Sequence, residues 1–150
     1  MIHIDFLDKI SQTFNLNLSY YDNDAILINP HSGAKIVLSD DTTSEYTEYT
    51  VSFSTQHRHF SSLEKAEEYI RLIISDEVLP IEFFESTRAR FGSEIRKNDF
   101  DDITTEKLAQ IFGYTVEYLS QFEFEVHSWS GTYDLKRTKV SELSKNLQNS

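Results

Sequence analysis

Cysteine is absent from this sequence of 150 residues. The chain therefore forms no disulfide and offers no thiolate to a metal ion, and we expect a reducing compartment, the cytoplasm, as its location. Glycine and proline are scarce, with four and two copies, and no segment is rich in Pro, Gly or Ser. Because no linker of that composition interrupts the chain, we expect residues 1–150 to form a single domain, which is long enough to bury its own core.

Long apolar runs are also lacking, since no stretch approaches the roughly 18 apolar residues that a transmembrane helix needs. The N-terminal segment MIHIDFLDKI carries Asp5 and Asp8 where a signal peptide would need an apolar stretch. We therefore expect the protein neither to cross a membrane nor to be exported.

Positive charge is scarce as well. The chain has 14 Lys and Arg against 25 Asp and Glu, which gives a formal net charge of −11. Such a surface repels the phosphates of nucleic acids and attracts basic proteins, although it also simply keeps a protein in solution. What the chain has in abundance is Phe (11) and Tyr (8), which suit cores and binding surfaces alike. We expect another protein as the partner, with a basic toxin as the concrete example, and no nucleic acid.

Hydrophobic periodicity predicts an α+β fold. Apolar residues at helical spacing predict amphipathic helices over 2–14 and 62–75, the second opened by a capping box of Ser61 and Glu64. Alternation and short apolar runs predict strands over 17–21, 25–29, 34–38, 48–55 and 81–91. For the last of these, a helix over 82–91 is the alternative. The pattern as a whole predicts an antiparallel sheet of about five to six strands with helices packed mainly on one face.

The C-terminal third predicts a further hairpin and a final helix. Residues 122–127 alternate, and a turn at Ser130-Gly131 leads into a second run over 132–137. With a two-residue loop, Val126 would face Leu135 and His127 would face Asp134. The segment 139–148 predicts a short amphipathic helix, with Val140, Leu143 and Leu147 on its apolar face.

The segment TTEKLAQIFGYTVEYLSQF (104–122) contains two helical patterns joined at Gly113. With Ala109 in the first helix and VEYLSQF (116–122) as the second, it resembles the helix-turn-helix of Cro-repressor-type DNA-binding regulators. That resemblance implies a second helix that reads bases in the major groove. Here the second helix presents Glu117, whereas phosphates and base edges call for Arg, Lys, Asn and Gln. The alternative interpretation is a core helix that ends at a glycine C-cap.

Two polar segments are candidate partner-binding sites. In an acidic, aromatic segment over 40–53, carboxylates can take the place of phosphate oxygens opposite the Lys and Arg of a basic protein, and Tyr supplies contact area. In a second segment over 91–102, Arg96 is followed by Asp99 and Asp101, which flank Phe100. We expect this segment to form a polar recognition loop. Solvated surface is the alternative for both. The candidate residues are Asp40, Asp41, Glu45, Tyr46, Glu48, Arg96, Asp99, Phe100, Asp101 and Asp102.

No catalytic or metal-binding pattern is complete. His57 and His59 would share one face of a strand, but a zinc site needs a third ligand. His127 and Asp134 suit the pair that orients a general base, but no nucleophile in a recognised turn accompanies them. We expect no cofactor and no catalysis. The leading hypothesis is a protein-binding module, similar in size and acidity to bacterial immunity proteins that neutralise a toxin; a DNA-associated regulator is the second and an enzyme the third.

Overall fold

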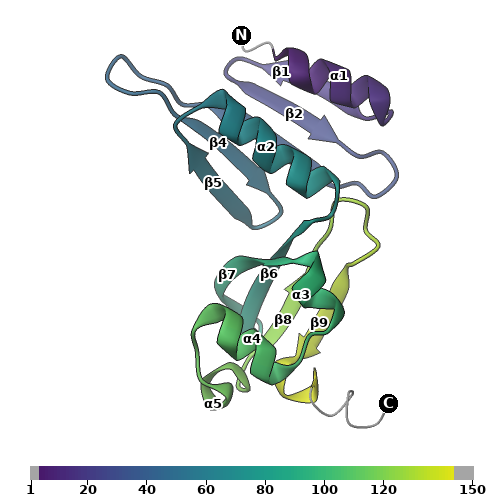
Figure 1. The fold of residues 1–150 in the computed structure, drawn as a ribbon, viewed down its shortest axis with the longest axis vertical. Coiled ribbons are helices and arrows are strands. Elements are labelled where there is room, and N and C mark those ends of the chain that lie inside the picture. The colour runs from purple at the N-terminus through teal and green to yellow at the C-terminus, as the bar shows by residue number, and fades with distance from the viewer. Residues whose placement is uncertain (1–3, 144–150) are drawn as a thin grey trace.

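The computed structural model describes residues 4–143 and shows an α+β fold with two antiparallel sheets (Figure 1). The first sheet contains β1 (Asn17–Tyr21), β2 (Asp24–Ile28), β3 (Lys35–Asp40), β4 (Tyr49–Phe53) and β5 (Gln56–Phe60) in that order. The second has the order β7-β6-β8-β9 and contains β6 (Val78–Glu85), β7 (Arg88–Arg96), β8 (Glu123–Val126) and β9 (Leu135–Lys139). The α+β class and the five-stranded sheet are thus confirmed, whereas the second sheet was not predicted. That all 150 residues form one domain stays a prediction.

Helices pack against both sheets. α1 (Asp5–Thr13) and α2 (Leu63–Ile74) lie on the same face of the first sheet (Figure 1). The N-cap of α2 is Ser62, whose hydroxyl accepts a hydrogen bond from the amide of Lys65, so the predicted start at Ser61 is one residue early. α3 (Lys97–Asp101), α4 (Thr105–Phe112) and α5 (Val116–Leu119) accompany the second sheet, and α4 and α5 contribute buried residues to its core.

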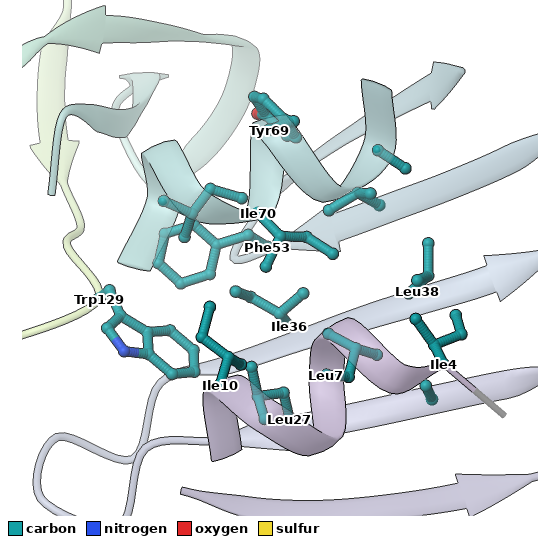
Figure 2. Packing of buried hydrophobic residues seen from close by; sticks show 14 of the residues in the cluster. Ile4, Leu7, Ile10, Leu27, Ile36, Leu38, Phe53, Tyr69, Ile70 and Trp129 are labelled. Carbon is teal, nitrogen blue, oxygen red and sulfur yellow. The ribbon is translucent and has the colours of Figure 1, made fainter. Parts of the chain in front are cut away.

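The core of the first sheet follows from strand alternation. Antiparallel pairing places Leu27 opposite Ile36 and Ile36 opposite Phe53, so that these side chains form a continuous row across three strands. This row faces Ile10 of α1 and Ile70 of α2, and all are buried (Figure 2). The helices and the sheet each have one apolar face, and only packing these faces together removes both from water.

The predicted strand over 81–91 is wrong, because a two-residue turn at Ser86-Thr87 divides it into β6 and β7. Ser86 has φ of 58°, as the first position of a tight hairpin turn requires. A β-bulge beside Phe83 adds one residue to β7, so that Phe83 and Phe91 pair on the same face. The alternation in the sequence therefore continues through the turn without a visible break.

The connector between β8 and β9 joins the two sheets. It spans 127–134, and its Trp129 is buried in the core of the first sheet, with its ring centroid 6.1 Å from that of Phe53 (Figure 2). The carbonyl of Trp129 accepts hydrogen bonds from the Asn29 amide at 3.0 Å and the Ser32 hydroxyl at 2.6 Å. The amide of Ser130 donates to the Asp76 carboxylate at 3.1 Å. These contacts fix one sheet against the other.

The predicted β8–β9 hairpin is confirmed with Val126 opposite Leu135, but its loop is longer than two residues. The predicted pair of His127 with Asp134 is wrong. Asp134 instead accepts hydrogen bonds from the amide and hydroxyl of Ser128, and His127 Nε2 lies 3.6 Å from Glu125. Helical structure follows at 140–143, and Leu147 of the predicted final helix lies outside the described residues.

A second contact between the two halves is centred on Glu94 of β7. Its carboxylate accepts hydrogen bonds from the hydroxyl of Tyr69 on α2 at 3.0 Å and from the guanidinium of Arg58 on β5 at 3.1 Å. The guanidinium also lies over the Tyr69 ring at 4.8 Å. Burial, followed by the negative charge of Glu94, raises the pKa of Tyr69 above its usual range. The phenol is thus held in its neutral, hydrogen-bond-donating form.

Substitution of Trp129 tests the first contact. Trp129→Ala should lower the free energy of unfolding by about 3–5 kcal/mol, as large-to-small substitutions of buried aromatic residues do. Urea denaturation measures the change. Tyr46→Ala is the control, because this ring is 55% exposed and its loss should cost less than about 0.5 kcal/mol. Equal stability of the two variants would contradict the role given to Trp129.

The pKa of Tyr69 generates a pH-dependent prediction. A tyrosine whose pKa is raised by folding stabilises the protein fully below the unfolded pKa of about 10, and this stabilisation is lost as the pH rises above it. The free energy of unfolding should therefore fall less steeply in Tyr69→Phe than in the native protein between about pH 9 and 11. Urea denaturation across that range measures the slope. Tyr21→Phe, which removes the hydroxyl of a ring that is 62% exposed, should keep the native slope.

Candidate protein-interaction surface

The segment 104–122 forms two short helices because its capping residues are well placed. The hydroxyl of Thr104 accepts a hydrogen bond from the amide of Lys107 at the start of α4, and Thr115 does the same for the amide of Tyr118 at the start of α5. Gly113 ends α4 with φ of 74°, a left-handed conformation that favours glycine. The predicted pair of helices is therefore present, but α5 has only four residues.

Only one side of these helices is buried. Leu108 and Leu119 are fully covered and belong to the core of the second sheet. Four large apolar side chains around Gly113 are instead 37–41% exposed, and we call them the aromatic surface: Ile111, Tyr114, Val116 and Tyr118. Because α4 stops at Gly113 and the chain turns, the apolar residues on both sides of the turn fall outside the buried stripe.

Ring contacts hold the aromatic surface in place. The Tyr114 ring lies 5.4 Å from Phe91 of β7 and 5.0 Å from Tyr118, and Tyr118 lies 5.2 Å from Phe122. Phe122 is buried and Phe91 is half-buried. The two exposed tyrosines are thus anchored at both ends by rings that belong to the core, at the centroid separations at which aromatic pairs attract.

The segment 97–122, which includes α3 and the helices that carry the aromatic surface, is acidic. Lys107 is 3.7 Å from Asp99, and Lys97 lies over the Tyr133 ring at 5.3 Å, so both cations of the segment 97–122 already have contacts. Against these two cations stand five acids: Asp99, Asp101, Asp102, Glu106 and Glu117. A ligand of this surface would therefore meet apolar rings in a negative field.

The first predicted segment forms the end of β3 and a projecting loop over 41–48, which extends away from the first sheet (Figure 1). The loop is held by backbone hydrogen bonds, including the amide of Asp41 to the carbonyl of Glu48 at 2.9 Å. Glu48 lies 3.6 Å from His59, and the Asp41 carboxylate accepts a hydrogen bond from Thr50. Glu45 and Tyr46 are exposed, while Asp40 is half-buried.

The second predicted segment is not a loop. Arg96 ends β7, and Asp99, Phe100 and Asp101 lie on α3, with Asp102 as its C-cap. Phe100 is half-buried, packs against the core of the second sheet and contacts the Tyr133 ring at 6.2 Å. It therefore does not form the exposed apolar centre of a recognition loop. The two predicted segments lie in different halves of the molecule (Figure 1), and the structure does not bring them together.

The sequence did not identify Ile111, Tyr114 and Val116 as candidate residues. The available signal was the position of Gly113, since a helix that ends there cannot continue its apolar stripe. Ile111 and Val116 lie on opposite sides of that glycine, and both are exposed.

The histidines of β5 do not form a metal site with other residues that the structure describes. Within 4–143, no three His, Asp or Glu side chains are placed to hold a metal ion. His57 and His59 share a face of β5, with ring centroids 5.4 Å apart, and His59 Nδ1 lies 3.0 Å from the Thr50 hydroxyl. None of the helices in this part of the chain is long and apolar enough to span a membrane.

Comparison of the chain with protein-family models, with curated proteins and with solved structures finds no match in any of the three.

Gly113 positions the aromatic surface, and its substitution tests the capping geometry. Gly113→Ala should destabilise the protein by about 1 kcal/mol, because a Cβ in the left-handed region is unfavourable. Since an added Cβ would meet no atom within 4 Å, the cost comes from the backbone and not from a clash. Thermal unfolding measures it, and Gly113→Asn should recover part of the loss, because Asn tolerates this conformation. An Ala variant as stable as the native protein would contradict the assignment.

Proposed function

We propose that the protein is a non-catalytic binding module that covers a basic partner protein, in the manner of an immunity protein or antitoxin. The observation that carries this proposal is the aromatic surface. Its four large apolar side chains lie within residues 111–118 and stay exposed although the chain has a large core. Exposed apolar groups that gather in one place, and are not scattered singly, favour a protein-interaction site. The absence of cysteine suits a partner met in the reducing cytoplasm.

Tyrosine gives this surface the properties of an interaction centre. Tyr114 and Tyr118 each combine a large apolar ring with a hydroxyl that can hydrogen bond, and tyrosine is among the residues that contribute most to binding energy at interfaces. Their contacts with Phe91 and Phe122 restrict both rings before binding. Less conformational entropy is then lost when a partner covers them.

Charge determines which partner fits. The net charge of −11 and the acids of α3, α4 and α5 would speed the approach of a basic protein and repel an acidic one. The partner's Lys and Arg would meet Asp99, Asp101 and Asp102, while its apolar groups cover the tyrosines. The loop over 41–48, which lies in the other half of the molecule, adds to this field and could contact a large partner.

A DNA-associated regulator is the alternative, because α4 and α5 do form two helices joined by a tight turn. Two observations favour the protein partner. A helix of four residues gives little length to place in a major groove, and its exposed Glu117 would face phosphates. An enzyme is the third hypothesis, and no arrangement of residues described here supports a particular reaction.

Capture of proteins encoded by neighbouring genes tests the proposal. The native protein should retain one basic protein at low and moderate salt, with tighter binding at low salt because the charges steer association. Tyr114→Ser combined with Tyr118→Ser should weaken the affinity, measured by titration calorimetry, at least about tenfold, as loss of interface anchors does.

The control is Tyr21→Ser, which removes an exposed ring from the first sheet, outside both candidate segments. This variant should bind as the native protein does. Equal weakening by this control and by the Tyr114 and Tyr118 double variant would contradict the proposal. Gln121 is exposed just after α5 and carries an amide that suits a base edge, so a gel shift with duplex DNA that is lost in Gln121→Ala would also contradict it.

A further inference from the structure

A hollow of about 370 Å³ is lined by residues from α1, from α2 and from the turns that follow them, and we call it the helix groove. Its walls include Ile10 and Phe14 of α1 and Leu72 and Ile74 of α2. A smaller hollow of about 220 Å³ shares Ile10 and Phe14 and continues the groove along α1. The volume lies within the range of small-molecule sites, which are mostly apolar with a few polar groups.

The apolar character of the groove results from the stripe of α1 continuing past the edge of the core. Ile10 is buried, but Phe6 is only partly buried and Phe14, which ends the helix, is 53% exposed. Phe6, Ile10 and Phe14 are spaced four residues apart and therefore follow one side of α1. An exposed phenylalanine on the wall of a hollow leaves apolar area that a ligand can cover.

Arg71 supplies the charge at one end of the groove. Its guanidinium carbon lies 4.5 Å from the centroid of the Phe6 ring, and both residues line the smaller hollow. An arginine stacked on a ring through its face keeps its N–H edges free to donate to a carboxylate. Lys9, one turn from Phe6 on α1, lines the same end.

Acids lie on both helices, among them Asp5 and Asp8 of α1 and Glu67 of α2, but the charged residues that line the smaller hollow are Arg71 and Lys9. Glu77 lines the opposite end, beyond Ile74 and Ser75. Glu67 lies one turn before Arg71 on α2, and burial raises its pKa although the positive charge of Arg71 acts in the other direction. Arg71 and Lys9 therefore form a small positive region at the mouth of an apolar groove, in a protein whose net charge is strongly negative.

We propose that the helix groove binds a single-chain amphiphile with one carboxylate, the fatty-acid class of ligand. The alkyl chain lies between α1 and α2, and the carboxylate accepts hydrogen bonds from Arg71 and meets the charge of Lys9. Phe6 and Phe14 are eight positions apart on α1, or roughly 12 Å at 1.5 Å per residue, which an extended chain of about eight to ten carbons would match. The site is separate from the aromatic surface and does not depend on the proposed function.

Octanoate and octanol are the probes, because they share one chain and differ in the charged head group. Titration calorimetry of the full chain at neutral pH should show one site that prefers octanoate at least about tenfold, as charge-assisted hydrogen bonds provide. Arg71→Gln should abolish the preference by weakening octanoate and leaving octanol unchanged. Arg88→Gln, which removes an exposed cation from the β6–β7 hairpin, should keep it.

A second variant tests the apolar wall. Phe14→Ser should weaken both probes to a similar degree, and because Phe14 is exposed the fold should survive, as circular dichroism would verify. The Tyr114 and Tyr118 variants should bind octanoate as the native protein does, which separates this test from that of the partner protein.

Two results would overturn the proposal. One is equal binding of octanoate and octanol by the native protein, and the other is no saturable binding of octanoate at concentrations below micelle formation.

Discussion

The insertion of Trp129 into the core of the first sheet is the contact on which the arrangement of this molecule depends. The residue belongs to the connector between two strands of the second sheet, yet its ring packs against Phe53 and its carbonyl is held by Asn29 and Ser32 (Figure 2). A buried indole is a large apolar surface, and the hydrogen bonds to its backbone fix its direction. The hydrogen bonds of Glu94 to Tyr69 and Arg58 add a polar contact between the same halves.

With the halves fixed in this way, each presents different groups to a ligand. The first half presents the helix groove of α1 and α2, which is mostly apolar and has Arg71 at one end. The second sheet has three short helices, and where α4 stops at Gly113 large apolar side chains remain uncovered. Short helices leave part of their apolar residues exposed because one or two turns cannot direct every such residue to the core. The aromatic surface arises from this limit, whereas the helix groove arises because the apolar stripe of α1 continues past the edge of the core.

The sequence predicted most elements of the first sheet because its strands alternate and its turns carry recognisable residues. It missed the division of 81–91 into two strands. The bulge beside Phe83 places Phe83 and Phe91 on the same face, so the alternation continues through the turn as it would in a single strand. It also placed Phe100 in an exposed loop, whereas α3 turns this ring toward the core and Tyr133. For the candidate surface, the sequence located the two helices of 104–122 and the acids before them, but not the exposure of Ile111, Tyr114 and Val116.

The sequence by itself determined the α+β class, the helix limits at capping residues such as Thr104 and Gly113, and the excess of negative charge. These properties depend on composition, on local hydrogen bonds and on periodicity within a few residues. Only the tertiary structure decided that the strands form two sheets, that Trp129 belongs to the core of the other sheet, and that the acidic segments over 40–53 and 91–102 lie in different halves. Such contacts join residues far apart in the chain, and their free energy comes from apolar area that several elements bury together, which no local pattern records.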